Sequence, residues 1–316
     1  MPASDQHPPP ESPGPKSIAL RARTEPVPQP VRIDTSQRIG LALGGGGARG
    51  IGHVAILEVF DELGLKPAYI AGTSIGALIG AAYASGMRGT EIRAHLIEAL
   101  ENRFFLVRQL FGARAHPVQR LLSVLPLRSA LINPEVLLDL VLPMHLSARI
   151  DDFQIPFAAI ATDMQAQAET AFTTGPIKPA IAASIAIPIL FSPVTVDGRL
   201  YADGGLVNPL PIEHLPTDVD LTVAIDVTGE RDPAAMTGHP TVTRMLVHSI
   251  AIFQKTIIRE RLRQAAPDID MDLDVGTFGA LQFHRVMDIL EAVEPAKAAF
   301  RDRLVRLLAT DPATSA

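Results

Sequence analysis

The chain of 316 residues contains no cysteine and no tryptophan, and aromatic residues make up only 5% of it. The missing cysteine excludes disulfides, thiolate zinc sites and a cysteine nucleophile. With so few aromatic side chains, the core must consist of leucine, isoleucine, valine and alanine. Apolar residues account for 47% of the chain and charged residues for 20%, a balance that predicts a sizeable folded core.

A basic run is also missing, and the 34 acidic residues outnumber the 28 lysines and arginines, which gives a formal net charge of −6. This charge argues against a nucleic acid as partner. No apolar stretch follows Met1, so we expect no secretory signal peptide. The expectation is a cytoplasmic protein, with transient peripheral contact with a membrane surface left open.

Two uncharged stretches, residues 67–87 and 179–196, are long enough to be considered as membrane spans. The first contains several glycines and two serines, and the second has Pro188 and Pro193 in its interior. We therefore interpret both stretches as buried parts of an α/β core.

Proline is concentrated at the start of the chain, where nine of the 27 prolines precede residue 31. This composition predicts a disordered, proline-rich tail over residues 1–36. We expect one ordered α/β domain over residues 37–316, with the motifs described below in residues 38–228. A C-terminal strand and helices are expected within residues 240–310.

A glycine-rich loop follows the first predicted strand. Residues 39–43 form a short apolar strand, residues 44–50 read GGGGARG, and a helix is predicted over residues 51–63. Backbone amides that no side chain covers, close to the start of a helix, form a natural anion site. We expect Arg49 to anchor this loop, and His53 to be a hydrogen-bonded core histidine and not a catalytic base.

The next strand leads into Gly72-Thr73-Ser74-Ile75-Gly76. Residues 67–70 are apolar, and small and apolar residues predict a helix over residues 75–84. G-x-S-x-G at a strand-to-helix junction is the pattern of a nucleophile elbow. Gly72 and Gly76 leave the tight turn free of bulk, and we expect an exposed Ser74 hydroxyl at a helix N-terminus that favours negative charge. Taken alone, the string is equally compatible with an ordinary turn.

The spacing brings the two loops together. Gly44 and Ser74 are 30 residues apart, which is the size of one β-α-β unit. A right-handed crossover places the C-terminal ends of its parallel strands side by side. The glycine loop and Ser74 should therefore meet at the sheet edge where open α/β sheets bind ligands.

The remaining pattern predicts further strands and helices. The region 88–150 is mostly helical, and its apolar cluster at residues 104–107 suggests core packing or a cap over the site ahead of a lipid contact. Strands are expected at residues 155–161, 169–173, 219–226 and 269–275, with an Asp-Gly hairpin over 194–202. Helices are expected at residues 90–110, 134–142, 178–185, 242–264, 281–290 and 295–309.

Three motifs in this order, residues 44–50, 72–76 and Asp203-Gly204-Gly205, resemble the patatin-like phospholipases. The resemblance is to the small stand-alone bacterial form, related to the neuropathy target esterase catalytic domain. His53 and residues 183–193 and 205–209 support it, and it covers about residues 38–228. It implies an α/β fold, namely a patatin-like three-layer sandwich with a mostly parallel central sheet and helices on both faces.

The resemblance also implies a function. Ser74 would be the nucleophile and Asp203 the base of a Ser-Asp dyad, with an oxyanion hole in the glycine loop at Gly45, Gly46 and Gly47. The implied reaction is calcium-independent hydrolysis of acyl esters in phospholipids or lysophospholipids, without metal or cofactor. The oligomeric state stays open. Supporting residues would be Gly44, Arg49, Gly50, Gly72, Gly76, Gly204 and Gly205.

Chemistry makes the aspartate unusual as a base, because its ordinary pKa of about 3.9 makes it weak. Burial beside apolar neighbours raises such a pKa, and Leu200, Tyr201, Leu206 and Val207 flank Asp203. Since a dyad needs no neutral histidine, we expect activity to persist well below pH 6.

Three other interpretations compete. Gly45, Gly47 and Gly50 also match the dinucleotide fingerprint, but the second strand ends in Gly72-Thr73-Ser74 and offers no acid for a ribose. A Ser-His-Asp carboxylesterase would need a histidine after Asp203, and a regulatory protein could keep the fold without activity. The candidate histidines for a triad are His214, His239, His248 and His284.

Overall fold

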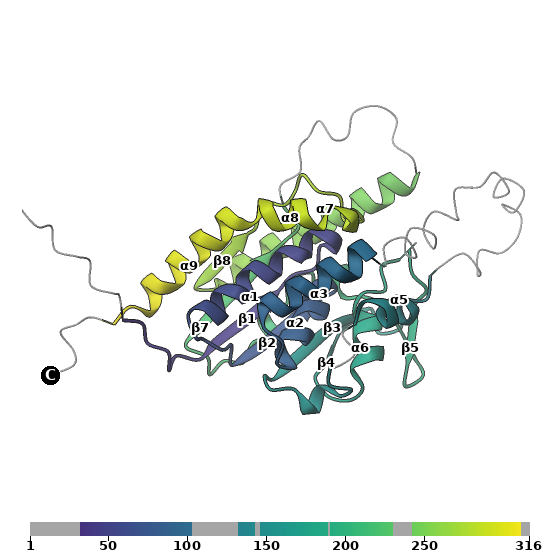
Figure 1. Cartoon of the computed structure of the whole chain (residues 1–316). Coiled ribbons are helices and arrows are strands. Elements are labelled where there is room, and N and C mark those ends of the chain that lie inside the picture. The colour runs from purple at the N-terminus through teal and green to yellow at the C-terminus, as the bar shows by residue number, and fades with distance from the viewer. Residues whose placement is uncertain (1–31, 103–131, 143–145, 189, 230–241, 311–316) are drawn as a thin grey trace, which may run out of the picture.

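The computed structural model describes residues 32–102, 132–142, 146–188, 190–229 and 242–310 (Figure 1). Most of the tail predicted over residues 1–36 therefore lies outside the described residues, as do the apolar cluster at 104–107 and His239. Within residues 32–36, Ile33 forms a bridge with Ala309 at the other end of the described chain.

Within the described residues, eight strands form one mixed sheet in the order β5-β6-β3-β2-β1-β7-β8, with β4 paired to β3 off this path. Neighbours among β1, β2, β3, β7 and β8 are parallel, whereas β4, β5 and β6 pair antiparallel. The strands are β1 Ile39–Leu43, β2 Tyr69–Thr73, β3 Phe157–Asp163, β4 Ala168–Phe172, β5 Val194–Val196, β6 Arg199–Asp203, β7 Leu221–Asp226 and β8 Ile269–Asp272. The mostly parallel sheet is confirmed.

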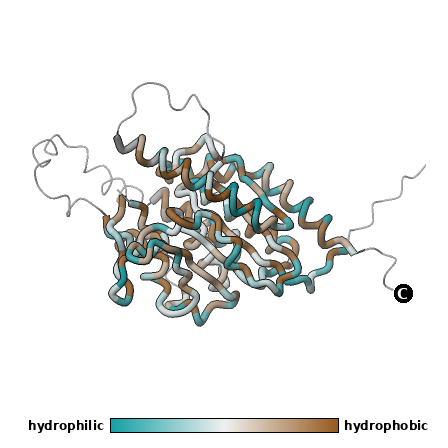
Figure 2. Tube along the Cα trace, turned by 180° about the vertical axis from the view of Figure 1, so that it is seen from behind, coloured by the Kyte–Doolittle hydropathy of each residue, from teal (hydrophilic) through white to brown (hydrophobic). Residues whose placement is uncertain are grey.

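Helices cover both faces of this sheet (Figure 1). α1, α2, α3, α8 and α9 lie over one face, α5 and α6 extend that layer towards β5, and α7 lies over the other face (Figure 2). The helices are α1 His53–Glu62, α2 Ile75–Ala84, α3 Gly89–Asn102, α5 Pro134–Val141, α6 Ile177–Ser184, α7 Val242–Ala265, α8 Val286–Ala292 and α9 Glu294–Leu308. The three-layer arrangement is confirmed.

The strand sequences follow from this burial on both faces. Every residue of β1 and β3 is buried, which explains the apolar runs at residues 39–43 and 157–161. Along β1, Leu41 and Leu43 pack into the larger core under α1 and α2. Ala42 points the other way, into the smaller core that Ile258 of α7 helps to close.

The two uncharged stretches fold as core segments. Residues 67–87 form β2 and α2, and residues 179–196 contain most of α6 and all of β5. In the part of the chain that the structure describes, no helix combines the length and the apolar character needed to cross a bilayer.

Several element bounds differ from the sequence predictions. The helix predicted from residue 51 is a 3₁₀ helix at Gly47–Gly52 followed by α1, and the strand predicted over 67–70 extends to Thr73. The helix predicted from residue 281 begins as a 3₁₀ turn at Phe283–Arg285. The hairpin of β5 and β6 turns at Asp197-Gly198 as predicted, with both residues at positive φ.

Candidate active site

Ser74 stands in the turn between β2 and α2 with φ 55° and ψ −121°. This region is costly for a residue with a side chain and is a common site of stored strain near functional groups. A Cβ at Gly72 would lie 2.6 Å from the Ala77 backbone, and one at Gly76 would lie 2.3 Å from Leu43 O. Both glycines are therefore required by close packing. Ser74 lines a cavity but is only 4% exposed, so the expected open exposure of its hydroxyl was wrong.

The sheet register explains how Asp203 reaches Ser74. β4 pairs along residues 159–163 of β3 and so occupies one edge of that strand. β2 pairs with residues 157–160 and β6 with residues 161–163, so β2 and β6 share the other edge. They meet end to end, and Ser74 Oγ donates a hydrogen bond of 2.7 Å to Asp203 Oδ2.

The Asp203 carboxyl group is fixed and almost completely buried. The backbone N–H of Asp203 donates to Ala186 O at 3.0 Å, and the backbone carbonyl of Asp203 accepts from Thr162 Oγ1 at 2.8 Å. The side-chain Oδ1 of Asp203 accepts from Gly205 N at 2.7 Å. Burial raises the pKa of Asp203 to about 6, against the opposing hydrogen bonds from Ser74 and Gly205. The carboxyl group is therefore a stronger base than an ordinary aspartate.

Ser184, at the end of α6, supports the turn from below. The Ser74 N–H donates to Ser184 Oγ at 2.9 Å, and that hydroxyl donates to Ile160 O at 2.6 Å. Both serines are buried. The sequence analysis placed Ser184 only within a supporting stretch, although one buried hydroxyl in an apolar helix was a usable signal.

The glycine loop lies directly beside Ser74. Gly46 and Gly47 line the same cavity as Ser74 and Asp203. The Gly44 and Gly45 amides donate to Ile225 O at 3.0 Å and to Pro209 O at 2.9 Å. The Gly45 amide is thus committed to the backbone, which leaves Gly46 and Gly47 as the candidate donors to a ligand.

Arg49 and His53 both hold this loop in place. Arg49 is 1% exposed, and its guanidinium donates to Gly46 O at 3.1 Å and to Thr228 O. His53 Nε2 lies 2.8 Å from Gly44 O, and burial lowers the pKa of His53 to about 4. A neutral ring that donates to a carbonyl agrees with the packed histidine expected from the sequence.

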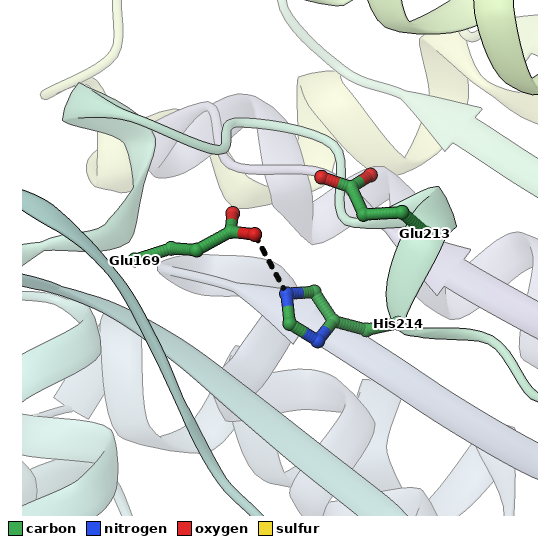
Figure 3. Close-up of side chains that lie close together, drawn as sticks. All are labelled: Glu169, Glu213 and His214. Atoms are coloured by element: carbon green, nitrogen blue, oxygen red, sulfur yellow. Dashed lines mark ion pairs between the residues drawn. The ribbon is translucent and has the colours of Figure 1, made fainter.

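A charge network surrounds Asn208, and three of its members, Glu169, Glu213 and His214, are drawn in Figure 3. Asn208 Nδ2 donates to Glu169 Oε2 at 2.6 Å and to Glu213 Oε1 at 2.8 Å, and Arg261 pairs with both carboxylates. His214 Nε2 lies 3.3 Å from Glu169 Oε1 and, with Asn208, holds the pKa of Glu169 below its usual range. These three acidic and imidazole groups could ligate a cation, but Arg261 and Asn208 already engage the same oxygens.

This network reaches the nucleophile through one further contact, because Thr73 Oγ1 donates to Asn208 O at 2.8 Å. The residue before Ser74 is thus tied to the segment that follows Asp203. The network therefore helps to fix the turn that carries Ser74 relative to the segment that carries Asp203.

Apolar side chains from four parts of the chain line the cavity over the dyad. They come from the segment after α6, from the turn after Asp203, from α7 and from the loop before α8. Such a lining suits an acyl chain better than a polar ligand. The lining residues outside the dyad and glycine loop include Ile187, Pro188, Leu190, Leu206, Ile250, Ala251, Gln254, Ala280 and Leu281.

The family model of the patatin-like phospholipases matches residues 41–216, which is more than half of the chain. The chain belongs to this family, and its fold is the patatin fold.

Curated relatives agree with this assignment. An NTE family protein of Mycobacterium tuberculosis is 36% identical over 245 residues, which cover 75% of this chain and 64% of that protein. Patatin-like phospholipase domain-containing protein 7 of Rattus norvegicus is 32% identical over 211 residues, which cover 66% of this chain and 15% of that protein. Lysophospholipase NTE1 of Pyricularia oryzae is 25% identical over 276 residues, which cover 80% of this chain and 18% of that protein. The chain thus spans less than two thirds of each of these relatives.

Among solved structures, VipD from Legionella pneumophila is similar with a TM-score of 0.42 and 14% sequence identity. That similarity covers 85% of this chain and 67% of the VipD chain.

Proposed function

We propose that this protein is a serine hydrolase that cleaves acyl esters of phospholipids or lysophospholipids, with Ser74 as nucleophile and Asp203 as base. The observation that carries the proposal is the 2.7 Å hydrogen bond from Ser74 Oγ to Asp203 Oδ2 inside a strained strand-to-helix turn. Membership of the patatin-like phospholipase family supports a lipid substrate. The relatives named lysophospholipase support an acyl ester as the bond that is cleaved.

In the first half of the reaction, Ser74 Oγ attacks the acyl carbonyl carbon while its proton passes to Asp203 Oδ2. A serine hydroxyl is a weak nucleophile without such a base. The raised pKa of Asp203 makes the transfer easier than it would be to an ordinary carboxylate. Return of that proton to the leaving oxygen releases the alcohol and leaves an acyl ester on Ser74.

The tetrahedral intermediate carries negative charge on the former carbonyl oxygen. We assign its stabilisation to the backbone amides of Gly46 and Gly47, because both residues line the cavity beside Ser74. A preorganised donor of this kind contributes about 3 kcal/mol. Gly47 has φ 62°, and a Cβ there would lie 2.2 Å from Ala280 O, so a side chain at this position would distort the loop.

In the second half, water attacks the acyl carbon of the ester on Ser74, and Asp203 accepts the proton from that water. The bond between Ser74 Oγ and the acyl carbon then breaks, the fatty acid leaves, and Asp203 returns the proton to Ser74 Oγ. The apolar lining from Ile187, Leu206 and Ile250 would hold the acyl chain during both halves. The same carboxyl group therefore acts once for each half of the cycle.

The test is hydrolysis of p-nitrophenyl esters, lysophospholipids and diacyl phospholipids by the parent protein and by Ser74→Ala. We expect activity on at least one lipid class, and its loss in the variant. Ser85→Ala is the matched control, because Ser85 Oγ donates only to Ala82 O at the end of α2. No activity on any acyl ester, or activity that survives in Ser74→Ala, would overturn the proposal.

A further inference from the structure

Among the described residues that line the active-site cavity, four carry polar side chains. Ser74 and Asp203 form the dyad, and the Arg49 guanidinium donates to backbone carbonyls. The fourth is the half-buried Gln254 of α7, which takes no part in the attack by Ser74. Within the described part of the chain its carboxamide makes no hydrogen bond, so this group is available to a ligand in the cavity.

Gln254 lies on the inward side of α7. Ile250, Gln254 and Ile258 follow one another at intervals of four residues and therefore share one side of the helix. Ile250 lines the cavity, and Ile258 is only 2% exposed in the smaller core. The carboxamide of Gln254 is therefore directed towards the catalytic edge of the sheet.

The second glycine after Asp203 leaves room for this carboxamide. α7 packs against the turn at residues 204–206. A Cβ at Gly205 would lie 2.4 Å from Gln254 Nε2 and 2.9 Å from Asp203 Oδ1. The amide nitrogen and the carboxylate oxygen thus flank one small space. Two hydrogen bonds of ordinary length span it, so a single ligand oxygen can contact both groups.

The proposed reaction brings an oxygen atom to the Asp203 carboxyl group in each half. In the first half this atom is the oxygen of the departing alcohol, which takes the proton from Asp203. In the second half it is the oxygen of the attacking water, which gives a proton to Asp203. A carboxamide N–H beside the carboxylate can donate to a lone pair of that oxygen without exchanging a proton.

We propose that Gln254 is a further catalytic residue, which holds the attacking water through a hydrogen bond from Nε2 while one O–H of that water points at the Asp203 carboxylate. The water oxygen then bonds to the acyl carbon as its proton moves to Asp203. Next, the bond between Ser74 Oγ and that carbon breaks, the fatty acid leaves, and the proton returns to Oγ. The proposal rests on the proposed function, because it assigns a residue to the second half of that reaction.

A p-nitrophenyl ester separates the two halves, because p-nitrophenolate leaves as an anion and needs no proton. Rapid mixing with the full-length protein, followed by mass measurement of the intact chain, gives the rates at which the acyl group joins and leaves Ser74. In Gln254→Leu we expect an unchanged rate of attachment. Loss of the acyl group should be about tenfold slower, because the water loses one hydrogen bond.

Gln264→Leu is the matched control, since Gln264 is an exposed glutamine on the same helix and donates to Glu260 Oε1 at 2.8 Å. It should equal the parent in both rates. Equal rates of acyl loss in Gln254→Leu and the parent, or an equal fall in attachment and loss, would overturn the role of Gln254 and leave the dyad intact. No attachment to Ser74 in either protein would overturn the proposed function and this role with it.

The pH dependence of kcat/KM gives a second readout, which a merely structural role of Gln254 would not change. Gln254→Glu keeps the size of the side chain and places a second carboxylate beside Asp203. Because a like charge disfavours the ionised form of the base, the fall of kcat/KM at low pH should begin about one pH unit higher than in the parent. Gln264→Glu should keep the parental profile. A parental profile in Gln254→Glu would overturn the placement of Gln254 beside the base.

Discussion

Replacing Asp203 by asparagine separates the catalytic role of this buried carboxyl group from its effect on stability. Burial raises its pKa from 3.8 to about 6, a difference that corresponds to about 3 kcal/mol. Since the folded-state pKa is the higher one, the folded protein binds the proton more tightly. This stabilisation is fully present below about pH 4 and is lost as the pH rises through 6.

Asparagine cannot ionise, and its side-chain oxygen can still accept the hydrogen bond from Gly205 N. At pH 8 we therefore expect Asp203→Asn to have a higher free energy of unfolding than the parent, by up to about 3 kcal/mol. The difference should shrink as the pH falls towards 4. Hydrolysis should drop by about 10²–10⁴-fold, because a positioned general base is lost.

The assays are urea unfolding at several pH values and initial rates on the best ester. Asp197→Asn is the control, since Asp197 is exposed in the β5–β6 turn, and it should change neither quantity. A folded Asp203→Asn protein with parental activity would refute Asp203 as base. A stability difference that does not vary with pH would refute the argument from burial.

The raised pKa also changes the expected rate profile. With Asp203 as base, kcat/KM should fall about tenfold per pH unit below about 6. The sequence-based expectation of activity well below pH 6 therefore no longer holds. A histidine base would give a similar fall of kcat/KM at low pH. The aspartate and histidine variants, and not the pH profile, therefore distinguish a dyad from a triad.

Four further predictions concern the same site. A fluorophosphonate probe should label Ser74, and labelling that persists in Ser74→Ala would contradict this. Ser184→Ala should lower kcat and destabilise the fold by about 1–3 kcal/mol in urea unfolding, because the buried Ser74 N–H loses its acceptor; parental values would count against it. A chelator should leave hydrolysis unchanged, since the proposed steps use a carboxylate, amides and water; loss restored by calcium would refute this. His248→Ala and His284→Ala should each reduce the rate less than Asp203→Asn, and one folded but inactive variant would favour a triad.

The sequence was sufficient to place the glycine loop beside Ser74. Both motifs follow parallel strands, and a right-handed crossover leaves little freedom in where the strand ends lie. β1 and β2 pair in parallel, with Leu43 opposite Gly72, which puts the two loops at one edge as predicted. Local pattern and chain topology therefore determine this half of the site.

The contacts of Asp203 could not be read in the same way. Its position depends on β6 pairing with β3 just beyond the residues of β3 that pair with β2. The sequence of a single strand does not determine its register with a strand that is distant in the chain. The engagement of the Gly45 amide by Pro209 O depends on the same long-range folding. Sequence reasoning named these residues but could not tell which amides stay available to a ligand.

The described chain begins and ends at one point of the fold. Thr310 N donates to Arg32 O at 3.0 Å, and Asp34 N donates to Leu308 O at 2.8 Å. Figure 1 shows this junction at the left, at the opposite end of the sheet from the C-terminal ends of β1 and β2. Polypeptide joined at either end would therefore start from the same place on the surface and would not cross the sheet edge that carries Ser74. The fold has the geometry of an insertable module, which suits a family whose matching segment is 15% of the rat relative.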